Sequence, residues 1–200
     1  MKLILVRHGQ TVENVNGIMQ GQDTSLGKLT ELGLQQAEKL ARRLESECLD
    51  VIFTSDLERA LHTAEIVAQY HEGVPFHVTP LLRERDYGVL TGLHKEKLFE
   101  EIDMAGLTEV SLRPEQGENY HDVKVRAREF LDALIEKYIG KEVLMVAHGG
   151  YNRAFLSTAL NVPLDEMFGI SQGNTCVNII EFDKYGLGTE VAIDSRSHLE

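Results

Sequence analysis

The sequence predicts an α/β fold, a three-layer α/β/α sandwich with a largely parallel central sheet. Short apolar segments alternate with longer segments in which apolar residues recur at helical spacing, and this alternation is typical of βαβα units. Several of the apolar segments end in glycine-containing or polar turns. The 200 residues, 42% hydrophobic and 26% charged, suit one soluble domain with a sizeable core. We therefore expect residues 1–200 to form a single domain.

Two strand–helix units are predicted in the first half of the chain. Residues 2–6 form a strand, and residues 30–47 form an amphipathic helix. The residues expected on the buried face of this helix are Leu32, Ala37, Leu40, Ala41 and Leu44. Residues 50–54 are the second strand, and residues 56–70 are the second helix. This order indicates parallel strands joined by helices.

The second half continues the alternation after a less regular segment. A short strand is expected between Pro75 and Pro80, followed by a loop over residues 81–92. The longest helix is predicted over 118–139, with apolar positions Val125, Phe130, Leu131, Leu134 and Ile135. The remaining elements are a strand over 142–147, a helix over 151–160, a strand over 175–182 and an edge strand around 190–193.

The net charge and the cysteine content exclude several classes of protein. A formal net charge of −12 opposes nonspecific binding to nucleic acid or to an anionic membrane. The two cysteines, Cys48 and Cys176, lack the spacing of a disulfide framework or a structural zinc site. The apolar run near Met1 is too short for a signal peptide, and no later stretch is long enough to cross a bilayer. These features predict a cytoplasmic protein.

Two predicted strands end in a histidine followed by glycine. Arg7-His8-Gly9 follows the first strand, and His148-Gly149-Gly150 follows the strand over 142–147. Because the carboxyl ends of parallel strands meet at one edge of a sheet, we expect both histidines there. The glycines would let a ligand approach the backbone. The other histidines are expected to be structural or exposed: His62, His71, His77, His94, His121 and His198.

Charged residues of two other segments are expected near the same edge. Arg59, in TSDLERALHTA, lies just inside the helix that follows the second strand. With Arg7 it would form a pair of guanidinium groups suited to the oxygens of a phosphoryl group. In LLRERDYG, both Glu84 and Asp86 could supply a carboxylate, and the sequence pattern does not choose between them.

Other catalytic motifs do not fit the chain. GISQG, residues 169–173, matches the serine hydrolase pattern GxSxG, but a strand follows the motif where a helix is required. No P-loop, no cysteine phosphatase loop and no HExxH motif is present. We therefore expect neither a metal nor a cofactor.

Four motifs together resemble the histidine phosphatase superfamily, the phosphoglycerate mutase-like proteins. They are LVRHGQT, SDLERALHTA, LLRERDYG and VAHGG, in this order over residues 3–150. The resemblance implies the phosphoglycerate mutase-like fold and a phosphohistidine intermediate on His8. It further implies that Arg7, Arg59 and His148 hold the phosphoryl oxygens and that Glu84 is the general acid and base.

The same resemblance assigns six positions to substrate binding. These are Asn14, Gln20, Gly21, Tyr87, Lys95 and Gly149. Asn14 would line the phosphate pocket, whereas Tyr87 and Lys95 would contact the rest of the substrate. No contacts are assigned to residues 22–28, because this loop is longer than is usual in the family.

The segment after Glu84 carries features of two branches of the family. ERDYGVLTGLHK keeps the spacing of Tyr87 and Lys95 seen in mutases, whereas SLRPEQGEN offers only Arg113 where mutases carry an arginine pair. The short form resembles broad-specificity and fructose-2,6-bisphosphatase-type phosphatases. We expect a metal-independent phosphatase acting on a small phosphorylated metabolite of the sugar phosphate or phosphoglycerate class. The alternatives are a 2,3-bisphosphoglycerate-dependent phosphoglycerate mutase and a noncatalytic protein that binds phosphorylated ligands. The sequence predicts no oligomeric state.

Overall fold

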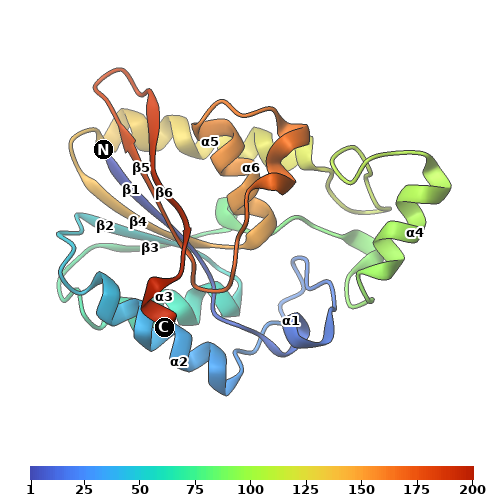
Figure 1. The fold of residues 1–200 in the computed structure, drawn as a ribbon, viewed down its shortest axis with the longest axis horizontal. Coiled ribbons are helices and arrows are strands. Elements are labelled where there is room, and N and C mark those ends of the chain that lie inside the picture. Colours follow the sequence, from blue (N-terminus) through green and yellow to red (C-terminus); the bar gives the residue numbers. More distant parts are fainter.

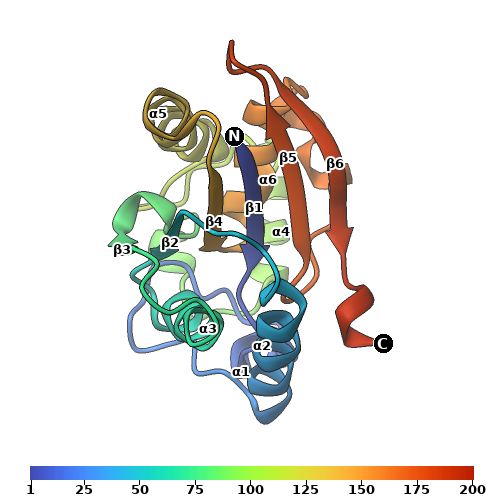
Figure 2. The ribbon, with the colours of Figure 1, turned by 90° about the vertical axis from the view of Figure 1, so that its left-hand side faces the viewer.

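A six-stranded sheet forms the centre of the protein, and the computed structural model describes all residues from 1 to 200. The strands are β1 (Lys2–Arg7), β2 (Val51–Ser55), β3 (Phe76–Thr79), β4 (Glu142–Ala147), β5 (Val177–Phe182) and β6 (Gly188–Ser195). Their order across the sheet is β3-β2-β4-β1-β5-β6, as Figure 2 shows. The first four of these are parallel, while β5 and β6 are antiparallel to their neighbours. The predicted largely parallel sheet is confirmed.

Helices cover both faces of this sheet. The α-helices are α1 (Val12–Asn16), α2 (Glu31–Leu44), α3 (Glu58–Ala68), α4 (Glu96–Ala105), α5 (Tyr120–Tyr138) and α6 (Gly149–Ala159). Helices α2 and α3 lie on one face, and α5 and α6 lie on the other (Figure 1). The predicted three-layer α/β/α arrangement is therefore confirmed. None of the helices combines the length and the apolar character that a bilayer crossing requires.

The central strands supply side chains to both layers of the core. In β1, Leu3 and Leu5 pack in the cluster that contains α5 and α6, whereas Ile4 and Val6 pack in the cluster that contains α2 and α3. Because successive side chains of a strand point to opposite faces, an uninterrupted apolar run is what a doubly covered strand requires. This is why the first strand could be recognised from its composition.

Two predicted core positions are wrong. Leu32 of α2 is 49% exposed, because it lies outside the stripe of buried residues of that helix. Val125 of α5 is 68% exposed, because it lies on the side of the helix opposite its buried residues. In α2 it is Gly33 that packs against the preceding loop, where a Cβ atom would lie 2.1 Å from the carbonyl oxygen of Gln10. The side chain of Thr30 accepts a hydrogen bond from the Gly33 N–H and caps this helix.

The boundaries of several other elements differ from those predicted. Helix α6 begins at Gly149, directly after His148, rather than at Tyr151. Strand β5 begins at Val177, two residues after the predicted start. The reason is that Thr175 has a φ of 52°, in the left-handed region that a β-branched residue rarely adopts. Two short 3₁₀ turns, Pro80–Leu82 and Gly88–Leu90, overlap the predicted loop over 81–92. Helix α4 follows this segment and projects away from the main body on the right of Figure 1.

Candidate active site

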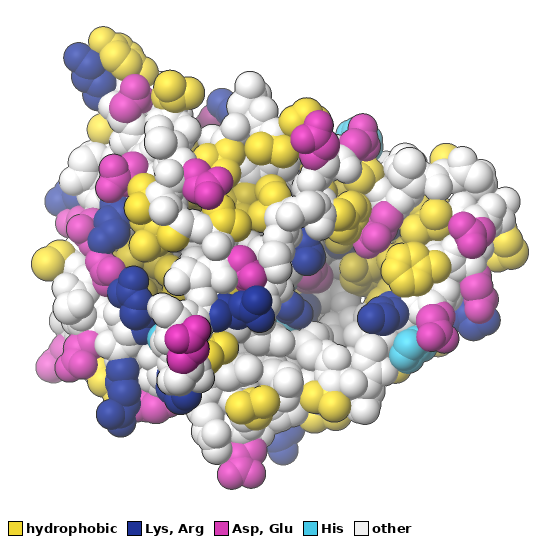
Figure 3. Space-filling view, in the orientation of Figure 1, with side chains coloured by type: hydrophobic (Ala, Val, Ile, Leu, Met, Phe, Trp, Pro, Cys, Tyr) yellow, Lys and Arg dark blue, Asp and Glu magenta, His cyan; other side chains and the backbone are white.

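A cavity of about 410 Å³ opens at the carboxyl ends of β1 and β4. In Figure 3 it is the hollow between the main body and the segment that contains α4, with Lys and Arg side chains at its rim. Ten of the eleven predicted site residues line it: Arg7, His8, Asn14, Gln20, Gly21, Arg59, Glu84, Tyr87, Lys95 and Gly149. The exception is His148, which is fully buried and adds no surface to the cavity.

His8 follows the end of β1, and one of its ring nitrogens is hydrogen-bonded to the backbone. Its Nδ1 atom lies 2.7 Å from the carbonyl oxygen of Gly9, so the proton belongs on Nδ1 and the lone pair on Nε2. Burial holds the pKa of His8 well below its usual value of 6.5, and the charges of Arg7 and Arg59 act in the same direction. The imidazole is therefore neutral at neutral pH, as a nitrogen nucleophile must be.

Arg7 and Arg59 present buried N–H groups beside His8. Arg7 Nη1 donates to the carbonyl oxygen of Gln172 at 2.6 Å, and Arg59 Nη2 donates to that of Gly21 at 2.8 Å. The remaining buried nitrogens without a protein partner are Arg7 Nε, Arg59 Nε and Arg59 Nη1. Burial lowers the pKa of Arg59 to about 10, which still leaves it charged at neutral pH. The oxygens of a phosphoryl group would satisfy these donors.

His148 lies against His8 rather than on the cavity wall. The two ring centroids are 5.3 Å apart, and neither ring nitrogen of His148 has a protein partner. Burial holds the pKa of His148 well below 6.5, and Arg59 and His8 add to this effect. A neutral imidazole in this position keeps one N–H, which has no acceptor within the protein.

The two glycines at the strand ends serve different purposes. Gly149 lines the cavity, as expected, and a Cβ atom there would lie 3.2 Å from Arg7 Nε. Gly9 is not among the residues that line it. A Cβ atom at Gly9 would lie 2.6 Å from the carbonyl oxygen of Gly33, so the close approach of α2 explains this glycine.

Of the two carboxylates that the sequence left open, Glu84 lines the cavity and Asp86 does not. Its Oε2 accepts from the Gly150 N–H, and its Oε1 accepts from the N–H groups of Tyr151 and Arg85, each at 2.9 Å. The side chain of Asp86 instead accepts from the Gly88 N–H at 2.8 Å and shapes its own turn. The structure thus places Glu84 in the cavity with His8 and Arg59, and places Asp86 outside it.

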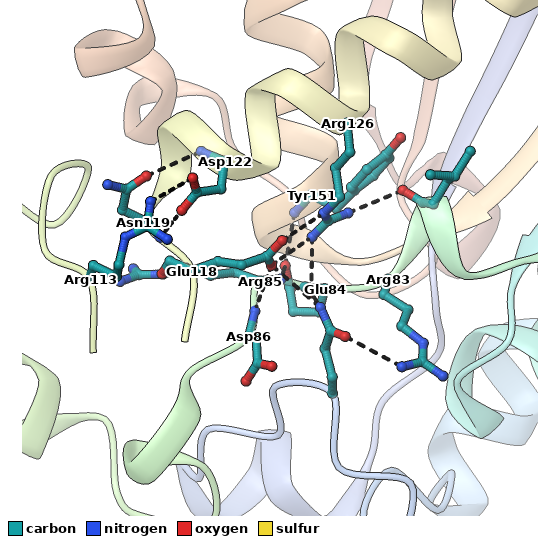
Figure 4. A network of polar contacts seen from close by, with 12 residues as sticks. Arg83, Glu84, Arg85, Asp86, Arg113, Glu118, Asn119, Asp122, Arg126 and Tyr151 are labelled. Carbon is teal, nitrogen blue, oxygen red and sulfur yellow. Dashed lines mark hydrogen bonds and ion pairs between the residues drawn. The ribbon is translucent and has the colours of Figure 1, made fainter. Parts of the chain in front are cut away.

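An ion pair behind the cavity fixes the segment that carries Glu84. Figure 4 shows Arg126 of α5 reaching toward Glu118, whose carboxylate it contacts at 3.0 and 3.1 Å. Arg126 Nη2 also donates to the carbonyl oxygen of Glu84 at 3.1 Å, and Glu118 Oε2 accepts from the Asp86 N–H at 2.9 Å. Gln22, in the long loop, donates to the same Glu84 carbonyl at 2.9 Å. The sequence pattern did not identify this pair.

A second support for His8 comes from the loop between α6 and β5. Asn174 Nδ2 donates to the carbonyl oxygen of His8 and to Asn14 Oδ1, both at 3.1 Å. The N–H of Thr175 donates to the same His8 carbonyl at 3.3 Å. The left-handed conformation of Thr175 is thus found where the loop contacts His8, and local strain at such places is typical of functional sites.

The variant Asn174→Ala is expected to slow turnover more than it destabilises the fold. It removes two hydrogen bonds that position His8 and Asn14, so kcat should fall by about tenfold, with a smaller change in KM. Steady-state kinetics and thermal unfolding check this, with the exposed Asn16→Ala as the control. An unchanged kcat with a lowered Tm would show a merely structural role.

Acid is expected to destabilise the protein below pH 6.5. The folded state holds the pKa values of His8 and His148 below 6.5, so between those values and 6.5 the unfolded chain binds more protons. The free energy of unfolding should therefore fall as the pH falls, by up to about 1.4 kcal/mol per pH unit for each histidine. Thermal unfolding between pH 7.5 and 5 checks this, and His148→Gln should flatten the slope. An unchanged slope in that variant would contradict the assignment to His148.

The outer part of the cavity contains residues that the sequence did not indicate. Arg153 of α6, Glu109, Tyr120 and Phe168 line it together with the predicted Tyr87 and Lys95. Arg153 lies one helical turn after Gly149. This spacing was the one sequence feature that could have indicated any of these residues. Arg113 lies elsewhere and pairs with Asp122 at 2.6 Å. No group of three or more His, Cys, Asp or Glu side chains is arranged to hold a metal ion.

Comparison with known proteins gives a consistent result. A family model described as histidine phosphatase superfamily (branch 1) matches residues 3–194. A probable phosphoglycerate mutase GpmB from Yersinia enterocolitica is 38% identical over 168 residues, which cover 82% of this chain and 76% of that protein. The structure of Bacillus stearothermophilus YhfR has a TM-score of 0.89 at 33% identity, covering 100% of this chain and 99% of that one. Phosphoserine phosphatase from Entamoeba histolytica in complex with 3-phosphoglyceric acid has a TM-score of 0.86 at 26% identity, with the same coverage.

Proposed function

The chain belongs to the histidine phosphatase superfamily and is an enzyme of the phosphomonoesterase type, and on this premise we propose that it hydrolyses small phosphorylated metabolites through a phosphohistidine on His8. The observation that carries the proposal is a neutral, buried His8 beside the unpaired N–H groups of Arg7 and Arg59, in one cavity with Glu84. These are the nucleophile, the anion-binding donors and the proton carrier that phosphoryl transfer requires.

The first half of the reaction transfers the phosphoryl group to the enzyme. His8 Nε2 attacks phosphorus in line, the Nε2–P bond forms and the bond from phosphorus to the ester oxygen breaks. Glu84 gives a proton to the leaving oxygen, so the product leaves as an alcohol. Arg7, Arg59 and His148 stabilise the negative charge on the equatorial oxygens, because their donors are already in place.

The second half returns the enzyme to its starting state. Glu84 removes a proton from a water molecule, whose oxygen attacks phosphorus and breaks the Nε2–P bond. Inorganic phosphate is released, and Glu84 again carries the proton. The amides at the start of α6 hold the Glu84 carboxyl at the cavity for both steps. We also propose that the protein is cytoplasmic. The two free cysteines support this location.

Hydrolysis is favoured over mutase activity by the cations of the outer cavity. A mutase must hold a second phosphoryl group while it returns the first to a bound alcohol. Arg113 is engaged with Asp122 and lies outside the cavity, which leaves Lys95 and Arg153 for this purpose. The relatives named probable phosphoglycerate mutase keep mutase activity as the second candidate.

A substrate panel that measures two products tests the proposed function. Sugar phosphates, phosphoglycerates and other phosphomonoesters are incubated with the enzyme in EDTA, and both free phosphate and the isomeric phosphoglycerate are measured. The proposal predicts phosphate release that EDTA does not reduce. Interconversion of 2- and 3-phosphoglycerate faster than hydrolysis, stimulated by the bisphosphate, would favour the mutase. No product from any ester would favour a noncatalytic binding protein.

A further inference from the structure

The guanidinium of Arg7 has a single acceptor within the protein. Its Nη1 donates to the carbonyl oxygen of Gln172 at 2.6 Å, and its Nε is buried without a protein partner. The direction in which its remaining N–H groups point is therefore set by the place of the Gln172 carbonyl. Gln172 belongs to the loop between α6 and β5, adds no surface to the cavity and has no role in the proposed reaction.

The side chain of Gln172 is paired with that of Asn178 in β5. Gln172 Nε2 donates to Asn178 Oδ1 at 2.7 Å, and Asn178 Nδ2 donates to Gln172 Oε1 at 3.1 Å. The two carboxamides thus form both of the hydrogen bonds that a facing pair can form. Gln172 is 3% exposed and Asn178 is fully buried. Buried amides of this kind need partners for their other donors and acceptors as well.

Backbone groups of two neighbouring strands fix the Asn178 carboxamide. Its Nδ2 also donates to the carbonyl oxygen of Leu5 at 2.9 Å, and its Oδ1 also accepts from the Asp194 N–H at 3.0 Å. Leu5 of β1 is in register with Asn178, and β5 lies between β1 and β6 (Figure 2). Because a carbonyl only accepts and an N–H only donates, these contacts determine which atom of the amide is the nitrogen. Both N–H groups and both lone pairs of this carboxamide are used.

The Gln172 carboxamide is satisfied in the same way. Its Nε2 also donates to the carbonyl oxygen of Ser171 at 2.7 Å, and its Oε1 also accepts from Asn152 Nδ2 of α6 at 3.2 Å. The network therefore joins the loop to β1, β5 and α6. Strand β1 ends in Arg7, and helix α6 begins directly after His148. A fully satisfied polar network makes the elements that it joins rigid.

We propose that Gln172 is a positioning residue for Arg7. Its side chain, held by Asn178 and Asn152, fixes the backbone carbonyl that orients the Arg7 guanidinium toward the phosphoryl group. The inference rests on the proposed function, because that function assigns Arg7 to the phosphoryl oxygens. A group that orients a binding residue matters, because a small displacement of the binding residue lowers the rate by a large factor.

The variant Gln172→Met is expected to weaken phosphate binding without changing a residue of the cavity. Methionine keeps the backbone carbonyl and a similar length, but it forms none of the side-chain hydrogen bonds of Gln172. The Kd of inorganic phosphate should rise by about tenfold, and kcat/KM should fall by about tenfold for every ester, whatever its alcohol part. Isothermal titration and steady-state kinetics measure these effects. The matched control is Gln35→Met, at an exposed position of α2.

A double-mutant cycle with Arg7→Ala shows whether Gln172 acts through Arg7. In the Arg7→Ala background, Gln172→Met should change the Kd of phosphate by less than about twofold, because the group that it orients is absent. An equal loss in both backgrounds would overturn the proposal, since the loop would then act through another contact, such as that of Asn174 with His8. An unchanged Kd in folded Gln172→Met would overturn it as well.

A milder variant serves if Gln172→Met does not fold. Asn152→Leu removes one hydrogen bond from Gln172 Oε1, and it also removes Asn152 Oδ1, which is buried without a partner. It should therefore fold, and it should raise the Kd of phosphate by about threefold where Arg7 is present and leave it unchanged in Arg7→Ala. The same Kd shift in both backgrounds, or no shift in either, would contradict the role of Gln172.

The outcomes separate this inference from the proposed function, because the cycle on phosphate binding needs no turnover. Coupling between Gln172 and Arg7 without hydrolysis of any ester would support the positioning role and overturn the phosphatase. Hydrolysis without coupling would support the phosphatase and overturn the positioning role. If the folded enzyme neither bound phosphate nor hydrolysed an ester, both would be overturned.

Discussion

Replacing His8 with alanine is expected to lower kcat by about 10⁴-fold or more for every phosphomonoester that the enzyme accepts. The side chain is the nucleophile of the proposed reaction, and no other neutral nitrogen of the cavity is placed to replace it. His148 is fully buried beside His8 and adds no surface to the cavity from which its ring nitrogens could attack an ester. Phosphate release under saturating substrate measures this loss.

Two controls show whether the loss of activity comes from the missing nucleophile or from unfolding. His8 makes one side-chain hydrogen bond, to the Gly9 carbonyl oxygen, so His8→Ala should keep the fold and unfold in one cooperative transition. His121→Ala, at an exposed position of α5, should retain full activity. If folded His8→Ala kept more than a small fraction of the activity, a different residue would have to be the nucleophile.

Replacing Arg59 with methionine is expected to change activity and stability in opposite directions. Arg59 is 1% exposed, and its Nε and Nη1 atoms have no protein partner, so the free protein bears the cost of a buried charge. Methionine has a similar length and is apolar. The free energy of unfolding should rise by about 1 kcal/mol, although the Gly21 carbonyl loses its donor. At the same time kcat/KM should fall by about 10³-fold, because the transition state loses a charged donor.

Kinetics and thermal unfolding of the same sample test both parts of this prediction. Arg42→Met is the matched control, since that side chain is 70% exposed and pairs only with Glu38 on α2. It should change neither activity nor Tm by much. A lower Tm in Arg59→Met would mean that Arg59 stabilises the fold. Unchanged activity would mean that Arg59 does not bind the phosphoryl group.

The layers of the fold and the inner part of the cavity could be predicted because they follow from local patterns. Apolar runs such as 2–6 identify strands that are covered on both faces. Once the strands are parallel, their carboxyl ends meet, and this brings Arg7 and His148 to one edge. A resemblance of four motifs then assigned chemical roles that the patterns alone left open.

Apart from Tyr87 and Lys95, the outer part of the cavity could not be predicted, because long-range contacts decide which side chains face it. Glu84 and Asp86 are equivalent in the sequence, and only the amides at the start of α6 distinguish them. Glu109 lies in a segment without helical or strand periodicity, so nothing local marked it. Leu32 fits the helical spacing of apolar residues correctly, but it lies outside the contact between α2 and the sheet. The extent of that contact depends on how the helix is oriented on the sheet.

Trapping of the phosphorylated enzyme is the most direct test of the central claim that His8 is the nucleophile. Enzyme mixed with phosphate-labelled substrate is quenched in alkali during the first turnover, digested and examined by mass spectrometry. The account predicts a phosphoryl group on Nε2 of His8 that is stable in alkali, is lost in acid and forms at least as fast as kcat. Label on another residue, or turnover without any labelled enzyme, would contradict it.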